Sequence, residues 1–127
     1  MIDRIFPHEA PTPRGPYAPA VRAGDFIFVS GQGPIDVTTD KISTGDIRHE
    51  TRLALSNIQR ILKSCGATLA DVVKCSVFIR EGTDFAAMNE VYKEFFGETR
   101  PARTTVVATF HNPEMRVEID AVAYKPK

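Results

Sequence analysis

Two β-rich segments of the sequence carry apolar side chains on both of their alternating sets of positions. They are residues 25–31 and 71–79; in the first, Phe28 and Val29 are adjacent and both apolar. Successive side chains of a strand point to opposite faces of the sheet. Strands of this kind are therefore expected to be covered on both faces, and any fold for this chain has to supply both covers.

Two other segments repeat their apolar residues with the period of a helix. Residues 44–66 place one set at i, i+3 and i+4 spacing, namely Ile47, Thr51, Ala54, Leu55, Ile58, Ile61, Leu62 and Cys65. Gly66 stands where a glycine would end this helix. A second helix is predicted to begin at Thr83 or Asp84 and to stop at Gly97. Its apolar face is predicted to consist of Phe85, Met88, Tyr92 and Phe95.

The order of the predicted elements favours one α+β domain over residues 1–127. The proline-rich stretch 10–19 cannot be helical and is expected to form an extended strap. Two more strands, Thr104–Phe110 and Met115–Tyr124, are separated by the turn sequence HNPE. The two helices would pack on one face of a mixed sheet. The other face then needs a second copy of the chain, which predicts a symmetric homo-oligomer.

Composition and charge exclude several classes of protein. Sixteen basic and sixteen acidic residues give a formal net charge of zero, and no basic block suggests a nucleic-acid partner. No segment resembles a signal peptide or a membrane span. Cys65 and Cys75 form no CxxC pair, which favours buried thiols in a reducing compartment, by default the cytoplasm. The three histidines have no metal-ligand spacing, and GQGP lacks the lysine of a phosphate loop, so neither a metal nor a cofactor is expected.

The stretch TRPARTTVVATF places two arginines beside a proline where an apolar run begins. Arg103 is either a solvated loop residue or an anion-binding group on a loop that Pro101 stiffens. A guanidinium there would suit a carboxylate, which it can bind through two parallel hydrogen bonds. Glu118, in the last predicted strand, has a similar pair of interpretations: a solvated strand carboxylate or a member of a site.

Six motifs, in order along nearly the whole chain, resemble one known family. They are GPY, FVSGQGP, VVKCSVFI, DFAAMNEVYKEFF, RPARTTV and VEIDAVAY. Each alone is weak, but the ordered set resembles the RidA/YjgF family of reactive intermediate (enamine/imine) deaminases. The resemblance implies a chorismate-mutase-like fold: a curved sheet with two helices outside, and three copies forming a barrel-like core with active sites between subunits.

The resemblance also implies roles for particular residues. Arg103 would bind the substrate carboxylate, and Glu118 would position the attacking water. The remaining residues that match positions in the family cleft are Tyr17, Ser30, Gly31, Asn89 and Thr105. Thr105 departs from the pattern, because many members carry a cysteine there, although a hydroxyl can also hydrogen-bond a polar substrate.

The implied reaction is hydrolysis of small carboxylate-bearing imines, of the 2-aminoacrylate type, to 2-oxo acids and ammonia. One alternative is a 2-aminomuconate-type deaminase of aromatic degradation. A second is the endoribonuclease or translation inhibitor of older family labels, which zero net charge disfavours. A third is a trimer that binds carboxylates without turning them over.

Overall fold

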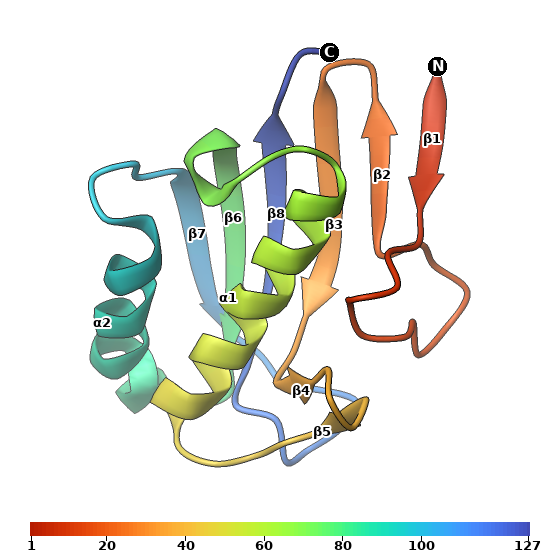
Figure 1. Cartoon of the computed structure of the whole chain (residues 1–127). Coiled ribbons are helices and arrows are strands. Elements are labelled where there is room, and N and C mark those ends of the chain that lie inside the picture. Colours follow the sequence, from red (N-terminus) through yellow and green to blue (C-terminus); the bar gives the residue numbers. More distant parts are fainter.

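The computed structural model describes all residues, 1–127, as a six-stranded sheet with two helices in front of it (Figure 1). The order of strands in the sheet is β1-β2-β3-β8-β6-β7, and β4 and β5 form a separate hairpin. The strands are β1 (Ile2–Ile5), β2 (Ala20–Ala23), β3 (Phe26–Gln32), β4 (Ile35–Asp36), β5 (Lys41–Ile42), β6 (Val72–Ile79), β7 (Ala102–Val107) and β8 (Val117–Tyr124). The helices are α1 (Ile47–Ser64) and α2 (Phe85–Phe96).

The sheet is mixed because one of its connections is a crossover. β6 and β7 are parallel, and α2 connects them, as a parallel pair requires. Every other pair in the sheet is antiparallel. Both helices cover the same face of the sheet, so the predicted α+β arrangement is confirmed (Figure 1).

The hydrophobic core lies between the helices and this covered face. Twenty-two buried residues form one cluster, in which Ile27 and Ile119 from the sheet meet Ile58 from α1. Cys75 belongs to this core, whereas Cys65 is half-buried, and both thiols are free. β3 and β6, the strands with apolar side chains on both faces, therefore bury within the single chain only the set that faces the helices.

Both helices end at the predicted glycines, but the predicted side-chain cap of α2 is wrong: Asp84 precedes the helix and makes no capping hydrogen bond with its side chain. The Asp46 side chain accepts a hydrogen bond from the His49 amide at the start of α1, and Gly66, with φ of 75°, ends it. Gly97, with φ of 57°, ends α2. The buried face of α2 differs from the prediction: it consists of Met88, Val91, Tyr92 and Phe96, while Phe85 is exposed and Phe95 half-buried.

The strand predictions need three corrections. β1 and β2, which pair from either side of the proline-rich strap, and the short β4–β5 hairpin were not predicted. β7 begins at Ala102 and ends at Val107, in place of the predicted Thr104–Phe110, so Arg103 lies inside an edge strand and not in the loop before it. β8 begins at Val117, because Met115 and Arg116 still belong to the preceding turn.

The second face of the sheet is open in the single chain. Phe28 is 46% exposed there, and the exposed rings of Phe26 and Tyr124 contact each other at a tilt, with 5.2 Å between their centroids. Apolar groups of this size are seldom left in water. The homo-oligomer remains a prediction that this face supports.

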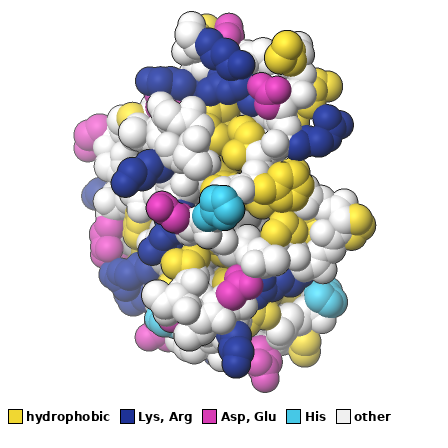
Figure 2. Space-filling view, turned by 45° about the vertical axis from the view of Figure 1, so that its right-hand side comes forward, with side chains coloured by type: hydrophobic (Ala, Val, Ile, Leu, Met, Phe, Trp, Pro, Cys, Tyr) yellow, Lys and Arg dark blue, Asp and Glu magenta, His cyan; other side chains and the backbone are white.

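Charges on the visible surface are mixed in sign. Figure 2 shows acidic and basic side chains interspersed, with no field of a single sign on this side of the molecule. No helix of the structure has the length and apolar character that crossing a bilayer demands.

Candidate active site

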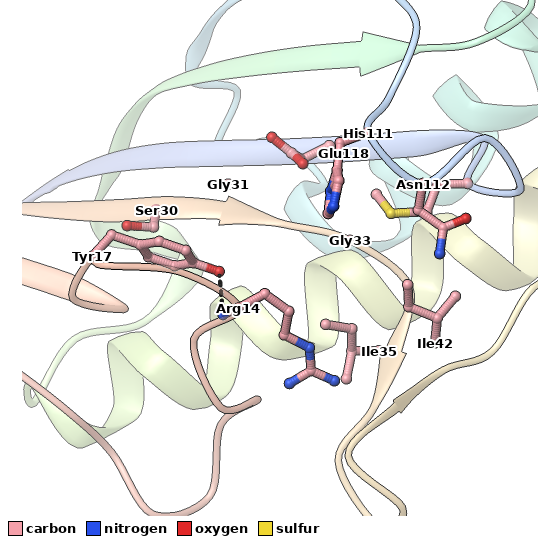
Figure 3. Close-up of a pocket in the computed structure, with 11 residues that line it drawn as sticks. Arg14, Tyr17, Ser30, Gly31, Gly33, Ile35, Ile42, His111, Asn112 and Glu118 are labelled. Atoms are coloured by element: carbon pink, nitrogen blue, oxygen red, sulfur yellow. Dashed lines mark hydrogen bonds between the residues drawn. The ribbon is translucent and has the colours of Figure 1, made fainter.

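A polar pocket lies at the end of β3, between the strap, the β4–β5 hairpin and the loop before β8 (Figure 3). Its volume is about 430 Å³, enough for a small metabolite. The lining residues are Arg14, Tyr17, Ser30, Gly31, Gly33, Ile35, Ile42, His111, Asn112, Met115 and Glu118. The pocket thus brings together four of the predicted site residues: Tyr17, Ser30, Gly31 and Glu118.

Glu118 supplies the carboxylate of this pocket from the open face of the sheet. It pairs with Phe78 across β6 and lies beside Gly31 of β3, where the β3–β8 register shifts. No protein group donates a hydrogen bond to it. Burial, reinforced by the nearby charge of Asp120, raises the pKa of Glu118 above its ordinary value of 4.5, and His111 partly offsets this rise.

Gly31 leaves the space that the carboxylate occupies. A Cβ on residue 31 would lie 2.9 Å from Cδ of Glu118 and 3.2 Å from its Cγ, and would also clash with Oε2. The register shift between Val29 and Gln32 indicates a bulge at this point, a feature often found beside active sites. The sequence interpretation of Gly31 as a simple strand end is therefore incomplete.

The proline-rich strap forms the opposite wall. The Tyr17 hydroxyl accepts a hydrogen bond from the Arg14 amide at 3.1 Å, and the Ser30 hydroxyl donates to the Ala18 carbonyl at 2.7 Å. Ser30 thus holds the strap against β3 with the proton of its hydroxyl. The geometry assigns it a structural role in addition to its place in the pocket wall.

The Arg14 guanidinium is occupied by contacts with the strap and with Asp40 in the turn of the β4–β5 hairpin. It donates to the Thr12 carbonyl at 2.6 Å and to Oδ1 of Asp40 at 3.1 Å. Hydrogen bonds from Thr12, together with Arg14, lower the pKa of Asp40 to about 2. The permanent cation of the pocket is therefore already paired.

Arg103 lies elsewhere, on the face of the sheet that the helices cover. It is in register with the core residue Cys75 across the parallel β6–β7 pair, whereas Glu118 is in register with Phe78. Because Cys75 and Phe78 are three residues apart, Arg103 and Glu118 project from opposite faces. Within one chain the two predicted catalytic residues do not meet.

Arg103 packs against aromatic rings of α2. Its guanidinium carbon lies 4.7 Å from the Tyr92 ring centroid and 5.6 Å from that of Phe85, which are cation–π distances. It forms no ion pair within the chain. Sequence analysis assigned Tyr92 to the core only, although its spacing of three residues from Asn89 places both on the same helix face.

Three buried polar atoms on β7 and α2 have no protein partner. They are Oδ1 of Asn89, the hydroxyl of Tyr92 and Oγ1 of Thr105. Burial, with a contribution from the Cys75 thiol, raises the pKa of Tyr92, and burial raises that of Cys75 to about 11. These groups are therefore neutral at ordinary pH. Unpaired buried polar atoms are uncommon, which marks the Arg103 region as a second place where a polar ligand could bind.

Sequence analysis assigned no role to seven residues of the pocket wall, and four of them lie on the strap or in the turn before β8: Arg14, His111, Asn112 and Met115. They reach the pocket through the folded strap and the turn before β8. No local sequence signal indicates such an approach. No cluster of histidine, cysteine and carboxylate side chains of the kind that holds a metal ion is found.

The fold has two layers of α+β type, and its pocket of about 430 Å³ with one carboxylate is of a size and chemistry suited to a small polar ligand. The chain belongs to the endoribonuclease L-PSP family, the RidA/YjgF proteins, whose model matches residues 7–125. This match confirms the resemblance found in the sequence motifs.

Three similar proteins illustrate the family. A RutC family protein of Pyrococcus horikoshii is 47% identical, covering 98% of this chain and 99% of its own length. A 2-iminobutanoate/2-iminopropanoate deaminase of Dermatophagoides farinae is 42% identical, covering 89% and 88%. The structure of Escherichia coli TdcF with bound serine superposes with a TM-score of 0.90 at 35% identity, covering 97% and 98%. The family therefore includes deaminases of reactive imines.

Proposed function

We propose that this protein is a deaminase that hydrolyses small 2-imino acids, tautomers of enamines such as 2-aminoacrylate, to 2-oxo acids and ammonia. Two findings on relatives support the substrate class: one is named as an iminobutanoate deaminase, and another binds serine. Serine carries a carboxylate and a nitrogen on the adjacent carbon, as the imino acids do. Free thiols at Cys65 and Cys75 are compatible with a cytoplasmic location.

We propose that the complete site forms between subunits of a homotrimer. The pocket holds a carboxylate, Glu118, but its permanent cation, Arg14, is already paired with Asp40. A substrate carboxylate therefore needs a cation from elsewhere. Arg103 has no ion pair and lies on the edge strand β7 with Thr105, packed against Tyr92 of α2, the helix that also carries Asn89. The Glu118 pocket lacks a free cation, and the Arg103 region has a cation without a carboxylate; we call these two regions the half-sites. This complementarity is the observation that carries the proposal.

The proposed chemistry requires positioning more than activation. Imines already react with water, so a carboxylate held on Arg103 of one subunit and a water held on Glu118 of the next would supply proximity and orientation. The pKa of Glu118 is raised, which moves it toward neutral pH. A general base is more effective when its pKa lies nearer to the pH at which the enzyme works. Tyr17 would cover the substrate from the strap.

The test follows ketoacid release from serine or threonine in the presence of an imine-generating dehydratase. We expect Arg103→Ala and Glu118→Gln each to abolish the acceleration. Mixing the two variants under subunit exchange should then restore about a quarter of wild-type activity, since one site in four would combine an intact Arg103 with an intact Glu118. No recovery in exchanged trimers would contradict a shared site.

The RNA-cleaving activity in the family's name has no support in the charges of this chain. Net charge is zero, and the visible surface shows no basic field (Figure 2). We expect nuclease-free preparations to leave RNA intact under conditions where ketoacid release is fast. A substrate panel that includes 2-aminomuconate distinguishes the small-imine proposal from the aromatic-degradation alternative.

A further inference from the structure

His111 extends into the same pocket as Glu118, from the loop that joins β7 to β8. Figure 3 shows its ring projecting into the cavity on the side of Glu118, above Gly33 and facing Arg14 across the space. The ring makes no hydrogen bond with the protein, and the residue is exposed at the mouth of the pocket. Both of its nitrogens are free to contact a ligand.

The loop that carries His111 is fixed at several points. The Asn112 side chain accepts from the Glu114 amide at 3.0 Å, and Arg80 donates to the Pro113 carbonyl at 2.6 Å. The Arg116 amide donates at 2.7 Å to the fully buried carboxylate of Glu50. A loop held in this way positions the imidazole reproducibly, which proton transfer requires.

The electrostatic setting of Glu118 involves few groups. Asp120 on its own strand raises its pKa, and His111 lowers it, so the imidazole is close enough for their charges to interact. The other ionisable groups facing the pocket are Arg14 and Tyr17 of the strap. Arg14 is neutralised locally by Asp40, and β3 contributes only Ser30 and Gly31. His111 is therefore the one imidazole that faces Glu118 in the pocket, and an imidazole can either give or accept a proton.

We propose that His111 is a second proton-transfer residue of this pocket, acting as the acid toward the imine nitrogen while Glu118 acts as the base toward water. The proposal rests on the proposed deaminase function and deepens it. In the addition step, water oxygen bonds to the imine carbon, Glu118 accepts one water proton, and the imidazolium gives its proton to nitrogen. The product is a neutral carbinolamine.

The second half of the reaction restores both groups. The carbon–nitrogen bond breaks as the protonated Glu118 gives its proton to nitrogen, and the carbinolamine hydroxyl gives its proton to the neutral His111. Ammonia and the 2-oxo acid leave, with Glu118 ionised and His111 protonated as at the start. One water proton reaches nitrogen through Glu118, and the other replaces the proton that His111 gave to nitrogen, so atoms and charge balance without a further reactant.

The test compares wild-type protein with His111→Gln over about pH 5.5 to 9, with the imine-generating enzyme in excess. The quantity measured is the ratio of wild-type to variant kcat/KM at each pH, in which the pH dependence of the imine itself cancels. We expect a ratio of about 100 near pH 6, the lower end of the range for general acid catalysis. The ratio should fall toward 1 at the alkaline end of the range, because a histidine acid is lost as the imidazole gives up its proton. His8→Gln, an exposed histidine outside the pocket, is the matched control and should keep wild-type activity throughout.

Each outcome has a distinct meaning. A ratio above 1 that does not change with pH would show that His111 only shapes the pocket, and a ratio of 1 throughout would remove it from the reaction; either overturns this inference alone. Wild-type protein that releases no ketoacid above the uncatalysed rate would overturn the deaminase proposal and this inference together. Size-exclusion profiles and thermal unfolding of His111→Gln, expected to match wild type, separate loss of proton transfer from loss of fold.

Discussion

Replacing Gly31 by alanine should displace the Glu118 carboxylate while leaving the fold intact. The added Cβ would lie 2.9 Å from Cδ and 3.2 Å from Cγ of Glu118, both closer than side chains normally approach. The obstacle is the free end of a flexible side chain, and not backbone. Since the pocket is open beside it, the carboxylate can swing away from the new methyl group.

We expect Gly31→Ala to lower kcat/KM strongly but stability only slightly. Overpacking costs about 1 to 3 kcal/mol, and the mobility of the carboxylate favours the lower value. At about 4 °C per kcal/mol for a chain of this length, the melting temperature should fall by about 4 °C. A displacement of about 1 Å in a reacting group can cost about 100-fold in rate, so kcat/KM should fall by about that factor.

Steady-state ketoacid release and thermal unfolding of the same preparations provide the assay. Gly45→Ala is a matched control, because its Cβ would lie 2.9 Å from the His49 ring, outside the pocket. We expect a similar loss of stability there with full activity. Gly31→Ala protein that keeps kcat/KM within about twofold of wild type would refute the reasoning, as the carboxylate would then not need its observed place.

Three further predictions follow from the same contacts. The raised pKa of Glu118 means that the folded chain binds a proton more tightly than the unfolded chain. The contribution of Glu118 to the free energy of unfolding should therefore decline as pH rises from about 4.5. Glu118→Gln should remove this part of the pH dependence, as measured by urea titrations at several pH values. Arg103→Lys should raise KM by about tenfold with little change in melting temperature, because an ammonium keeps the charge but loses the paired hydrogen bonds to a carboxylate; an unchanged KM would exclude a bidentate contact. Phe28→Glu, on the open sheet face, should give monomers in light scattering and lose ketoacid release, whereas a stable active oligomer would place the subunit contact elsewhere.

Much of the fold could be predicted because its signals are local. The periodicity of residues 47–65 and the glycines at 66 and 97 define two helices from neighbouring residues alone. Pairing between distant segments is different. β1 pairs with β2 across the proline-rich strap, and Arg103 became a strand residue because β7 adds to β6 two residues earlier than the apolar run suggested.

Only those site residues that belong to the recognised sequence motifs could be predicted. Tyr17, Gly31 and Glu118 were found through the family resemblance, and the structure places them in one pocket. His111 was passed over because a histidine in a turn has no spacing that indicates a partner. Its approach to Glu118 depends on how the loop folds back over the sheet, held by Arg80 and Arg116. Sequence periodicity does not indicate how this loop folds back over the sheet.

The split between the two half-sites has the same origin as the open apolar face. Glu118 alternates along β8 with the residues that face the helices, so it shares its face with Val122 and Tyr124. That face exposes Phe28 and cannot be covered by α1 or α2, which lie on the other side. In the proposed trimer, the copy that covers this face brings its own edge strand, with Arg103, toward a neighbouring pocket. Under this proposal, burial of the apolar face and completion of the site are one event, so variants that separate the subunits should lose both together.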